Sequence, residues 1–546
     1  MTLKQLLAQA NDWLEQDPDP ATRAELRALI DSQDEAALRE RFDTRLSFGT
    51  AGLRGELGAG PNRMNRVLVA QAAAGIAGWL KANSEAIIPS VVIGFDARVN
   101  SKTFALDSAS IFSAAGVRAT VIENPTATPI LAFAVREFGY SLGIMVTASH
   151  NPPRDNGYKV YLGGSQGGAQ IVSPVDAQMA AAIDEVAKTQ RLADIAKTDI
   201  FETAGDEIIE RYLSTTAALV GTPSSHPLKV VYTAMHGVGW APTKALFARV
   251  GLPEPIGVTQ QLEPDGGFPT VAFPNPEEPG ALDLAMHRAN EVAADLIIAH
   301  DPDADRLGVA VPTADAETGW RRLTGDEVGL LLGHEMAERA VGRSGTLATS
   351  IVSSSTLAAV AAAHKLNFVT TLTGFKHLAR VPELIFAYEE ALGYSVNPAR
   401  VPDKDGISAS LVLVDLANRL AEKGITLSQQ LEKLQQKYGH FATSQLSIRV
   451  TQIAALRDLM AELRANPPKK LDGATCRFTD LSVASDHLPT TDALLFELGE
   501  DRRVIIRPSG TEPKLKCYLQ AKGDTTEAAK ADLESLEKAV QRLLKR

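Results

Sequence analysis

Three stretches of the 546-residue chain repeat one pattern: a strand of β-branched residues, a polar turn, a helix of small residues and a second strand. They begin near Val91, Leu228 and Gly345, a spacing of roughly 120–140 residues. Solenoid repeats recur every ~20–50 residues, whereas units at the longer spacing have the size of separate domains. The pattern therefore predicts three related α/β domains.

The two ends of the chain follow other patterns. Four strands are expected near the C-terminus, at 444–450, 493–498, 503–506 and 515–520. The helix after them repeats apolar residues every three or four positions, at Ala529, Leu533, Leu536, Val540 and Leu543, so that it has one apolar face. We expect a fourth, α+β domain there, and a helical extension in the first 45 residues that packs on the first domain. The predicted domains are 1–205, 206–318, 319–438 and 439–546.

Composition limits the partners of the chain. Lysine and arginine total 55 and aspartate and glutamate total 66, a net charge of −11 that argues against nucleic acid or an anionic membrane as a general partner. The two cysteines, Cys476 and Cys517, form no CxxC pair, which suggests neither a disulfide framework nor a zinc site. The chain has no 18-residue apolar run and no apolar N-terminal core. We therefore expect no membrane span, no signal peptide and a cytoplasmic location.

The six residues from Thr147 to Pro152, Thr-Ala-Ser-His-Asn-Pro, follow an expected apolar strand at 142–146. This order places Ser149 at the carboxyl end of a strand, where open α/β sheets bind ligands. A serine there can be a nucleophile or carry a phosphate. The alternative is that Ser149 only hydrogen-bonds within its own turn, as serine often does.

Asp301, Asp303 and Asp305 follow another expected strand, and alternate carboxylates on an extended segment point to the same side. A calcium loop of the EF-hand type is excluded, because Arg306 and Pro312 stand where that loop needs glycine and glutamate. Three hard oxygen ligands favour Mg²⁺, with room for a phosphate oxygen or water. A solvated acidic turn, compensated by Arg306, is the alternative.

A loop near the C-terminus predicts an anion site. It contains Arg507, Ser509, Gly510, Thr511 and Lys514, which supply a guanidinium fork, hydroxyl groups, accessible backbone N–H groups and a cation. An ordinary basic surface turn is the alternative.

Two weaker candidates lie earlier in the chain. Glu389 and Glu390 can accept hydrogen bonds from sugar hydroxyls, although a glutamate pair more often faces solvent. The loop Thr373–Lys376 places a cation after the third repeat.

Two glycine-containing motifs lead elsewhere. The stretch 48–55 has neither G-x-G-x-x-G spacing nor a Walker lysine, so it predicts no nucleotide site, although Arg54 can still face a phosphate. Residues 163–167 match G-x-S-x-G, but no helix follows directly, which argues against Ser165 as a hydrolase nucleophile.

On the serine, aspartate, glutamate and arginine loops, which occur in the same order, the chain resembles the α-D-phosphohexomutase superfamily over nearly its whole length. The resemblance implies a heart-shaped arrangement of four domains, three of them related α/β domains and the last α+β. It implies a phosphoserine at Ser149, Mg²⁺ held by Ser149, Asp301, Asp303 and Asp305, and Lys159 as general acid and base. His150, Arg54 and His236 would complete the catalytic set. The substrate would contact Arg306, Lys376, Glu389, Glu390, Arg507, Ser509, Gly510, Thr511 and Lys514.

The sugar loop departs from the common form of that superfamily. Tyr388 replaces its first glycine and Ala391 a usual serine, and the run from Asp403 to Gly406 looks like the branch of type-2 phosphoglucomutases and phosphopentomutases. The resemblance implies a mutase that works through a phosphoserine and a sugar 1,6-bisphosphate, with glucose favoured and mannose or pentose phosphates as alternatives. A sugar phosphatase and a non-catalytic binder are the rivals. We expect a monomer or homodimer, and we expect crowding by arginine and Mg²⁺ to lower the pKa of Lys159.

Overall fold

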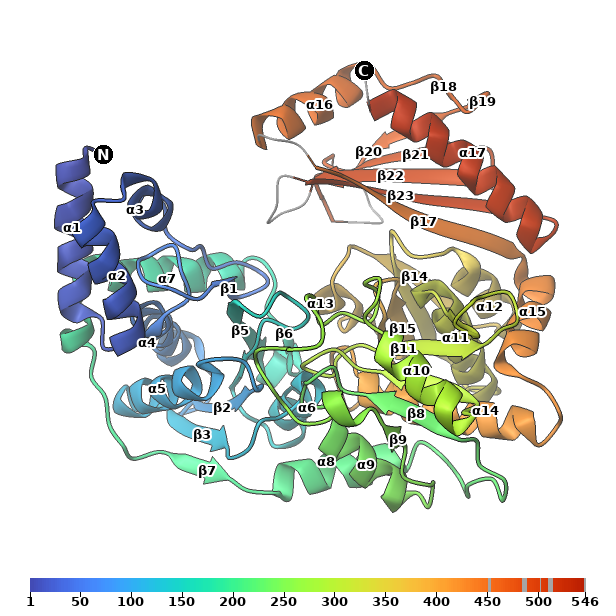
Figure 1. Cartoon of the computed structure of the whole chain (residues 1–546), viewed down its shortest axis with the longest axis horizontal. Coiled ribbons are helices and arrows are strands. Elements are labelled where there is room, and N and C mark those ends of the chain that lie inside the picture. Colours follow the sequence, from blue (N-terminus) through green and yellow to red (C-terminus); the bar gives the residue numbers. More distant parts are fainter. Residues whose placement is uncertain (450–452, 484–488, 501, 509–513, 545–546) are drawn as a thin grey trace. The chain divides into compact units, whose positions relative to one another are not determined.

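The computed structural model describes residues 1–449, 453–483, 489–500, 502–508 and 514–544 (Figure 1). The chain forms two compact units, one of residues 1–322 and 393–418 and the other of residues 323–392 and 419–546. The domain boundaries after residues 205, 318 and 438 stay a prediction.

Three helices form the N-terminal extension: α1 (Leu3–Gln16), α2 (Pro20–Ser32) and α3 (Glu35–Phe42). Each begins where a side chain caps it, because Thr2, Asp19 and Asp34 accept a hydrogen bond from a backbone N–H of the first turn. Leu6 and Trp13 of α1 join the apolar core of the first domain. The expectation that the extension packs on this domain is confirmed.

The first sheet has the strand order β1-β5-β4-β2-β3-β7, with β6 paired to β5. Its strands are β1 (Leu53–Glu56), β2 (Ser90–Phe95), β3 (Arg118–Ile122), β4 (Leu142–Val146), β5 (Asp155–Leu162), β6 (Ala169–Gln170) and β7 (Glu202–Ala204). The helices of this domain are α4 (Arg66–Asn83), α5 (Ser101–Ala114), α6 (Thr128–Glu137) and α7 (Val175–Thr189). Strands β2 and β4 are buried along their whole length, as parallel strands are when both faces of their sheet are covered.

The second sheet also lies in the first unit and has the order β12-β11-β10-β8-β9. Its strands are β8 (Val230–Thr233), β9 (Ile256–Gly257), β10 (Leu296–Ala299), β11 (Gly308–Pro312) and β12 (Trp320–Arg322). The helices around it are α8 (Glu207–Ala217), α9 (Trp240–Arg249) and α10 (Asp283–Val292).

The second unit contains two further sheets. The third sheet includes β13 (Thr346–Ser350), β14 (Asn367–Thr371) and β15 (Leu384–Glu389), with helices α11 (Gly325–Arg339), α12 (Thr356–His364), α13 (Phe375–Leu378) and α15 (Leu427–Tyr438). The fourth is antiparallel, in the order β17-β23-β22-β21-β20. Its strands are β17 (His440–Arg449), β20 (Arg477–Asp480), β21 (Leu494–Leu498), β22 (Arg502–Pro508) and β23 (Lys514–Gly523).

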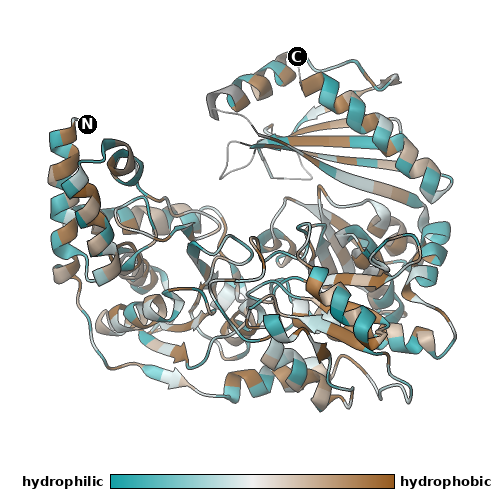
Figure 2. Ribbon diagram, viewed as in Figure 1, coloured by the Kyte–Doolittle hydropathy of each residue, from teal (hydrophilic) through white to brown (hydrophobic). Residues whose placement is uncertain are grey.

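The C-terminal domain matches its prediction and adds to it. Helix α17 (Thr526–Leu544) buries Leu533, Leu536 and Val540 on one face, and Figure 2 shows apolar and polar residues alternating along it. Strand β20, helix α16 (Ile453–Ala465) and the hairpin of β18 (Lys470–Leu471) and β19 (Ala474–Thr475) were not predicted.

One strand arrangement recurs in the first three sheets. The first strand of each repeat, β2, β8 or β13, lies between two parallel neighbours, which are β3 and β4, β9 and β10, or β14 and β15. A helix, α5, α9 or α12, connects the first strand to the second. The prediction of three related α/β domains is confirmed. The serine, aspartate and glutamate loops follow β4, β10 and β15, so the same position of the repeat carries each of them.

Residues 393–418 belong to the first unit although they follow β15 in sequence. They contain β16 (Gly393–Ser395) and most of α14 (Gly406–Ala421). Tyr161 Oη donates to Asp403 Oδ2 at 2.7 Å, and Tyr212 Oη donates to Asp405 Oδ1 at 2.8 Å. These buried hydrogen bonds hold the segment on the first unit.

Among the residues that the structure describes, no helix combines the length and apolar character that crossing a bilayer requires.

The packing of α4 against α7 gives a matched test. A Cβ on Gly75 would lie 2.6 Å from Ile183 Cα, whereas a Cβ on Gly78, one turn later, meets nothing within 4 Å. We expect Gly75→Ala to lower the free energy of unfolding of the first unit by about 1–3 kcal/mol. Gly78→Ala should raise it by about 0.5–1 kcal/mol through helix propensity. Chemical denaturation of both variants checks this, and equal effects at the two positions would contradict the close approach of the helices.

Candidate active site

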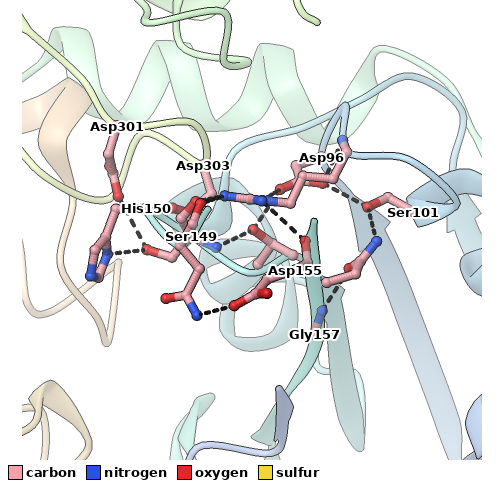
Figure 3. A network of polar contacts seen from close by, with 12 residues as sticks. Asp96, Ser101, Ser149, His150, Asp155, Gly157, Asp301 and Asp303 are labelled. Atoms are coloured by element: carbon pink, nitrogen blue, oxygen red, sulfur yellow. Dashed lines mark hydrogen bonds and ion pairs between the residues drawn. The ribbon is translucent and has the colours of Figure 1, made fainter. Parts of the chain in front are cut away.

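The loop after β4 holds Ser149 in an unusual conformation. Its φ is +52°, in the left-handed region, which costs a non-glycine residue free energy unless neighbouring groups hold it there. Its backbone N–H donates to Thr147 Oγ1 at 2.8 Å, and the Thr147 hydroxyl donates to Asp96 Oδ2 at 2.6 Å. Asp96 also accepts from Ser101 at 2.7 Å (Figure 3). The turn is therefore tied to the ends of β2 and α5.

Arg98 fixes the rest of the loop. Its guanidinium donates to four backbone carbonyl oxygens, those of Ser149, Asn151, Pro152 and Asp155, at 2.6 to 3.0 Å. A buried guanidinium that is satisfied by carbonyls in this way defines the path of a loop that has no secondary structure of its own.

The hydroxyl of Ser149 lies between two functional groups. Ser149 Oγ is 3.1 Å from Asp301 Oδ2 and 3.1 Å from His150 Nδ1 (Figure 3). Burial, and then the positive charges of Arg306 and Arg54, hold the pKa of His150 well below its ordinary value. The imidazole beside Ser149 is therefore neutral at pH 7.

Asp301, Asp303 and Asp305 form a buried cluster whose carboxylate oxygens lie within 4.8 Å of one another. Asp303 Oδ1 and Asp305 Oδ1 are buried and, within the described part of the chain, have no hydrogen-bond donor. Buried acceptors are rarely left without a partner. Three convergent oxygen ligands with two unsatisfied atoms fit a hard divalent cation such as Mg²⁺.

The three carboxyl groups titrate differently. Burial, and then the charges of Asp303 and Asp305, raise the pKa of Asp301 well above its ordinary value. Burial also raises the pKa of the other two, but Lys159 together with Thr128 at Asp303, and with Lys404 and Arg306 at Asp305, outweighs it, so the pKa of both groups is lowered. Without a cation the cluster therefore disfavours a third negative charge. The carboxyl group that resists ionisation is that of Asp301, which contacts Ser149.

Two lysines contact the cluster. Lys159, on β5, has its Nζ 2.7 Å from Asp303 Oδ2 and 3.1 Å from Asp305 Oδ2. Lys404 Nζ lies 3.2 Å from the same Asp305 oxygen. Burial opposes the charge of Lys159, but Asp303 and Asp305 outweigh burial and raise its pKa. Without a bound cation the shift is therefore upward, and the lowering expected from arginine and Mg²⁺ together stays a prediction.

Arg54 and Arg306 complete the charged surroundings. Arg54, on β1, donates to Asn151 Oδ1 at 3.2 Å, and burial lowers its pKa. Arg306 Nη2 is 3.5 Å from His150 Nε2, and its backbone N–H donates to Asp301 Oδ1 at 3.1 Å. Both predicted arginines therefore lie beside the serine loop.

His236 occupies a different position. Its Nε2 lies 2.8 Å from Thr270 Oγ1, and burial lowers the pKa of its imidazole. The next residue, Gly237, approaches the aspartate loop instead, because a Cβ there would lie 2.3 Å from Pro302 Cα. The backbone of this loop therefore meets the aspartate loop, whereas the imidazole contacts Thr270.

Several predicted substrate residues lie together in the second unit. Arg507, on β22, donates to Thr373 Oγ1, and the neighbouring Gly374 N–H donates to Glu389 Oε1 at 2.6 Å. Lys376 follows on α13. The arginine, lysine and glutamate loops are thus linked by hydrogen bonds.

Glu390 differs from its neighbour. Its Oε2 accepts from Ser353 Oγ at 2.9 Å and from Ser350 Oγ at 3.2 Å. Burial, and then the charges of Glu389 and Asp326, raise the pKa of Glu390 to about 7. At neutral pH this carboxyl group can both donate and accept a hydrogen bond.

The remaining members of the arginine loop are only partly described. Lys514 is the first residue of β23. Ser509, Gly510 and Thr511 lie outside the described residues.

Sequence reasoning did not select Arg98, Asp96, Lys404 or Thr128, whose hydroxyl donates to Asp303 Oδ2 at 2.6 Å. Asp96 and Arg98 directly follow a buried strand, which is the signal that pointed to Ser149. For Lys404 the sequence offers only its place in the run from Asp403 to Gly406, which resembles one branch of the superfamily. Thr128 stands at the start of α6 and has no such signal.

The opposite pKa shifts in the aspartate cluster give a paired prediction. Asp301 has a raised pKa in the folded state, so its charge destabilises the fold as the pH rises above the ordinary aspartate value of about 4. In EDTA at pH 8, Asp301→Asn should therefore have a free energy of unfolding roughly 1–3 kcal/mol above that of the original protein, and it should unfold at a higher temperature. Asp305 has a lowered pKa and stabilises the fold above that pH, so Asp305→Asn should be destabilised.

Calorimetry with and without Mg²⁺ checks both variants. Mg²⁺ should raise the unfolding temperature of the original protein and do so much less for either variant. A loss of stability in Asp301→Asn without metal would contradict carboxylate repulsion.

Sequence models of one family match four successive parts of the chain. They are phosphoglucomutase/phosphomannomutase α/β/α domain I at residues 45–190, domain II at 210–314, domain III at 324–438 and the C-terminal domain at 447–537. The order of the four matches is the order of the four sheets.

Individual relatives cover almost the full length. A protein named probable phosphomannomutase from Haemophilus influenzae is 46% identical over 88% of this chain and 98% of its own. The probable phosphoribomutase of Schizosaccharomyces pombe is 35% identical over 97% and 96%. The phosphoglucomutase of Staphylococcus epidermidis is 32% identical over 94% and 97%.

The fold has solved counterparts. The open form of the Paramecium phosphoglucomutase parafusin superposes with a TM-score of 0.72 over 92% of this chain and 96% of that one, at 20% identity. With four matched domains and full-length relatives, the chain belongs to the phosphoglucomutase/phosphomannomutase family of the α-D-phosphohexomutases and is an enzyme, a phosphomutase.

Proposed function

We propose that the protein interconverts hexose 1-phosphate and hexose 6-phosphate, with glucose as the favoured sugar, through a phosphoserine at Ser149. The observation that supports this most is the position of Ser149 Oγ, which lies 3.1 Å from Asp301 of the buried aspartate cluster. A hydroxyl at a cation site is suited to carry a phosphoryl group, because the cation offsets the charge of the phosphate.

The reaction takes two transfers. The bond between phosphorus and Ser149 Oγ breaks as phosphorus bonds to the free hydroxyl of the sugar 1-phosphate, and a sugar 1,6-bisphosphate results. After the bisphosphate turns over, Ser149 takes the other phosphoryl group and the 6-phosphate leaves. Sugar 1,6-bisphosphate added to the resting enzyme would phosphorylate Ser149 and so act as an activator.

Asp301, Asp303, Asp305 and Ser149 would hold the metal, for which we propose Mg²⁺. When bound, Mg²⁺ supplies positive charge beside the transferred phosphoryl group. Arg54 and Arg306 would bind the other oxygens of the phosphoryl group. The neutral imidazole of His150 would accept or donate a proton at Nδ1 beside Ser149 Oγ.

We assign proton transfer with the sugar hydroxyl to Lys159. Its pKa is raised by Asp303 and Asp305, so the side chain starts as an ammonium. A cation that binds these carboxylates would weaken their pull on Lys159 and favour release of its proton. His236 would contribute to catalysis through its loop, whose backbone lies against the aspartate loop.

The second unit would bind the sugar and its other phosphate. Glu389 and Glu390 would bind ring hydroxyls, and Lys376 would lie beside them. Arg507 with Ser509, Gly510, Thr511 and Lys514 would bind the phosphate that is not transferred.

Two other sugars have specific support. The 46% identical relative is named for phosphomannose, and the 35% identical relative is named for phosphoribose. The same chemistry serves each of them, so the choice depends on the contacts of the sugar loop.

The proposal predicts transfer without loss of phosphate. With Mg²⁺ and a trace of glucose 1,6-bisphosphate, the protein should convert glucose 1-phosphate to the 6-phosphate faster than it converts the 1-phosphates of mannose or ribose. Ser149→Ala should lower the rate by about three orders of magnitude or more, because the covalent intermediate is lost. Measuring product and inorganic phosphate together checks this, since phosphate release alone would indicate a phosphatase.

Arg507→Ala should raise the KM for the sugar 1-phosphate by ~10- to 100-fold, because a charge-assisted contact with phosphate is lost. Phosphorylation of Ser149 should change less. Arg477→Ala is the matched control and should leave KM unchanged, since the exposed side chain of Arg477, on β20, pairs with Glu497 at 2.6 Å. An unchanged KM in Arg507→Ala would remove this residue from the phosphate site.

A further inference from the structure

Three helices of the second unit bring four ligand-type side chains together, away from the serine and aspartate loops in sequence. His334 and Glu338 are four residues apart on α11 and so share one face. His364 is the last residue of α12, and Tyr438 is the last residue of α15. One ligand atom from each of His334, Glu338 and His364 lies within 4.8 Å of the other two.

The separations fit a single ion. Tyr438 Oη lies 3.1 Å from His334 Nδ1 and 3.1 Å from His364 Nε2. His364 Nε2 lies 3.5 Å from Glu338 Oε1. Ligands about 2.0–2.1 Å from a tetrahedral zinc ion are separated from one another by roughly 3.3–3.4 Å. The distances of 3.1 and 3.5 Å lie on either side of that value, so small side-chain movements would close the site.

The donor set selects the type of metal. Imidazole nitrogens with a carboxylate suit Zn²⁺ and related transition metals, whereas Mg²⁺ prefers oxygen ligands alone. Half of the Glu338 side chain is exposed, at 52%, so an ion can enter from solvent. The carboxylate also neutralises part of the charge of the ion. The sequence argument against a zinc site considered cysteine ligands alone. The site described here needs no cysteine.

We propose that His334, Glu338, His364 and Tyr438 bind one Zn²⁺ ion that joins α11, α12 and α15. The ion would be structural, because all four positions around it are filled by protein side chains. Tyr438 stands two residues before β17, so bound zinc would fix the point where the third domain passes into the fourth.

Metal titration of the whole protein tests this proposal. Protein without a polyhistidine tag is saturated with Mg²⁺ and titrated with Co²⁺, whose visible absorption reports four-coordinate binding, and then with Zn²⁺ by calorimetry. We expect one equivalent of Zn²⁺ and displacement of Co²⁺. We also expect a rise in the unfolding temperature. Asp301→Asn should bind the same equivalent, which separates this site from the aspartate cluster.

Single substitutions identify the ligands. His334→Ala and His364→Ala should each weaken Zn²⁺ binding by ~100-fold or more, and Tyr438→Phe should weaken it less, because the other three ligands remain. His287→Ala is the matched control. His287 pairs with Glu291, four residues later on its helix, at 3.2 Å, but among the described residues this pair is not part of a cluster of three or more ligand side chains. It should bind Zn²⁺ like the original protein.

Circular dichroism establishes that each variant is folded, and His364→Gln provides a second, closer variant. Absence of micromolar Zn²⁺ binding by the original protein would overturn the proposal. Unchanged binding in both histidine variants would overturn it as well. In either case the four side chains form only a hydrogen-bonded contact centred on Tyr438.

Discussion

The central physical constraint in this protein is the burial of three carboxylates within one short loop. Asp301, Asp303 and Asp305 are all at most 1% exposed, and such a group of charges is stable only if cations surround it. Lys159 comes from the first sheet and Lys404 from the returning segment 393–418, so the charge balance of one loop requires three separate parts of the chain to assemble. The lysines pair with only some of the carboxylate oxygens, which leaves others for a metal.

The same loop position recurs in each α/β repeat, but its chemistry differs. After β4 it carries the serine, after β10 the aspartates and after β15 the glutamates. Parallel strands direct their carboxyl ends to one edge of a sheet, where backbone groups are not used in pairing and side chains can serve a ligand. The same position of the repeat therefore offers a different kind of side chain to a ligand in each domain.

Local pattern was sufficient for the repeated elements and for the loops that follow them. Strand–turn–helix patterns located β2, β8 and β13, and polar residues after buried strands located Ser149 and Asp301. The contacts that depend on distant residues could not be predicted in this way. Lys404 pairs with Asp305 across 99 residues of sequence (404 − 305), and no periodicity reports such a pair. The upward pKa shift of Lys159 in the absence of a cation was missed for the same reason, because it depends on which oxygens the ammonium contacts.

The path of the chain between the two units affects how the protein is made. The chain leaves the first unit after residue 322, returns at residue 393 and leaves again after residue 418. During synthesis from the N-terminus, the first unit cannot acquire Lys404, or the partners of Tyr161 and Tyr212, until most of the third domain has emerged from the ribosome. Until then Asp305 has one cation fewer, and the nascent first unit must wait for the later segment before its charges are balanced. A fragment that ends at residue 322 would remain permanently in that state.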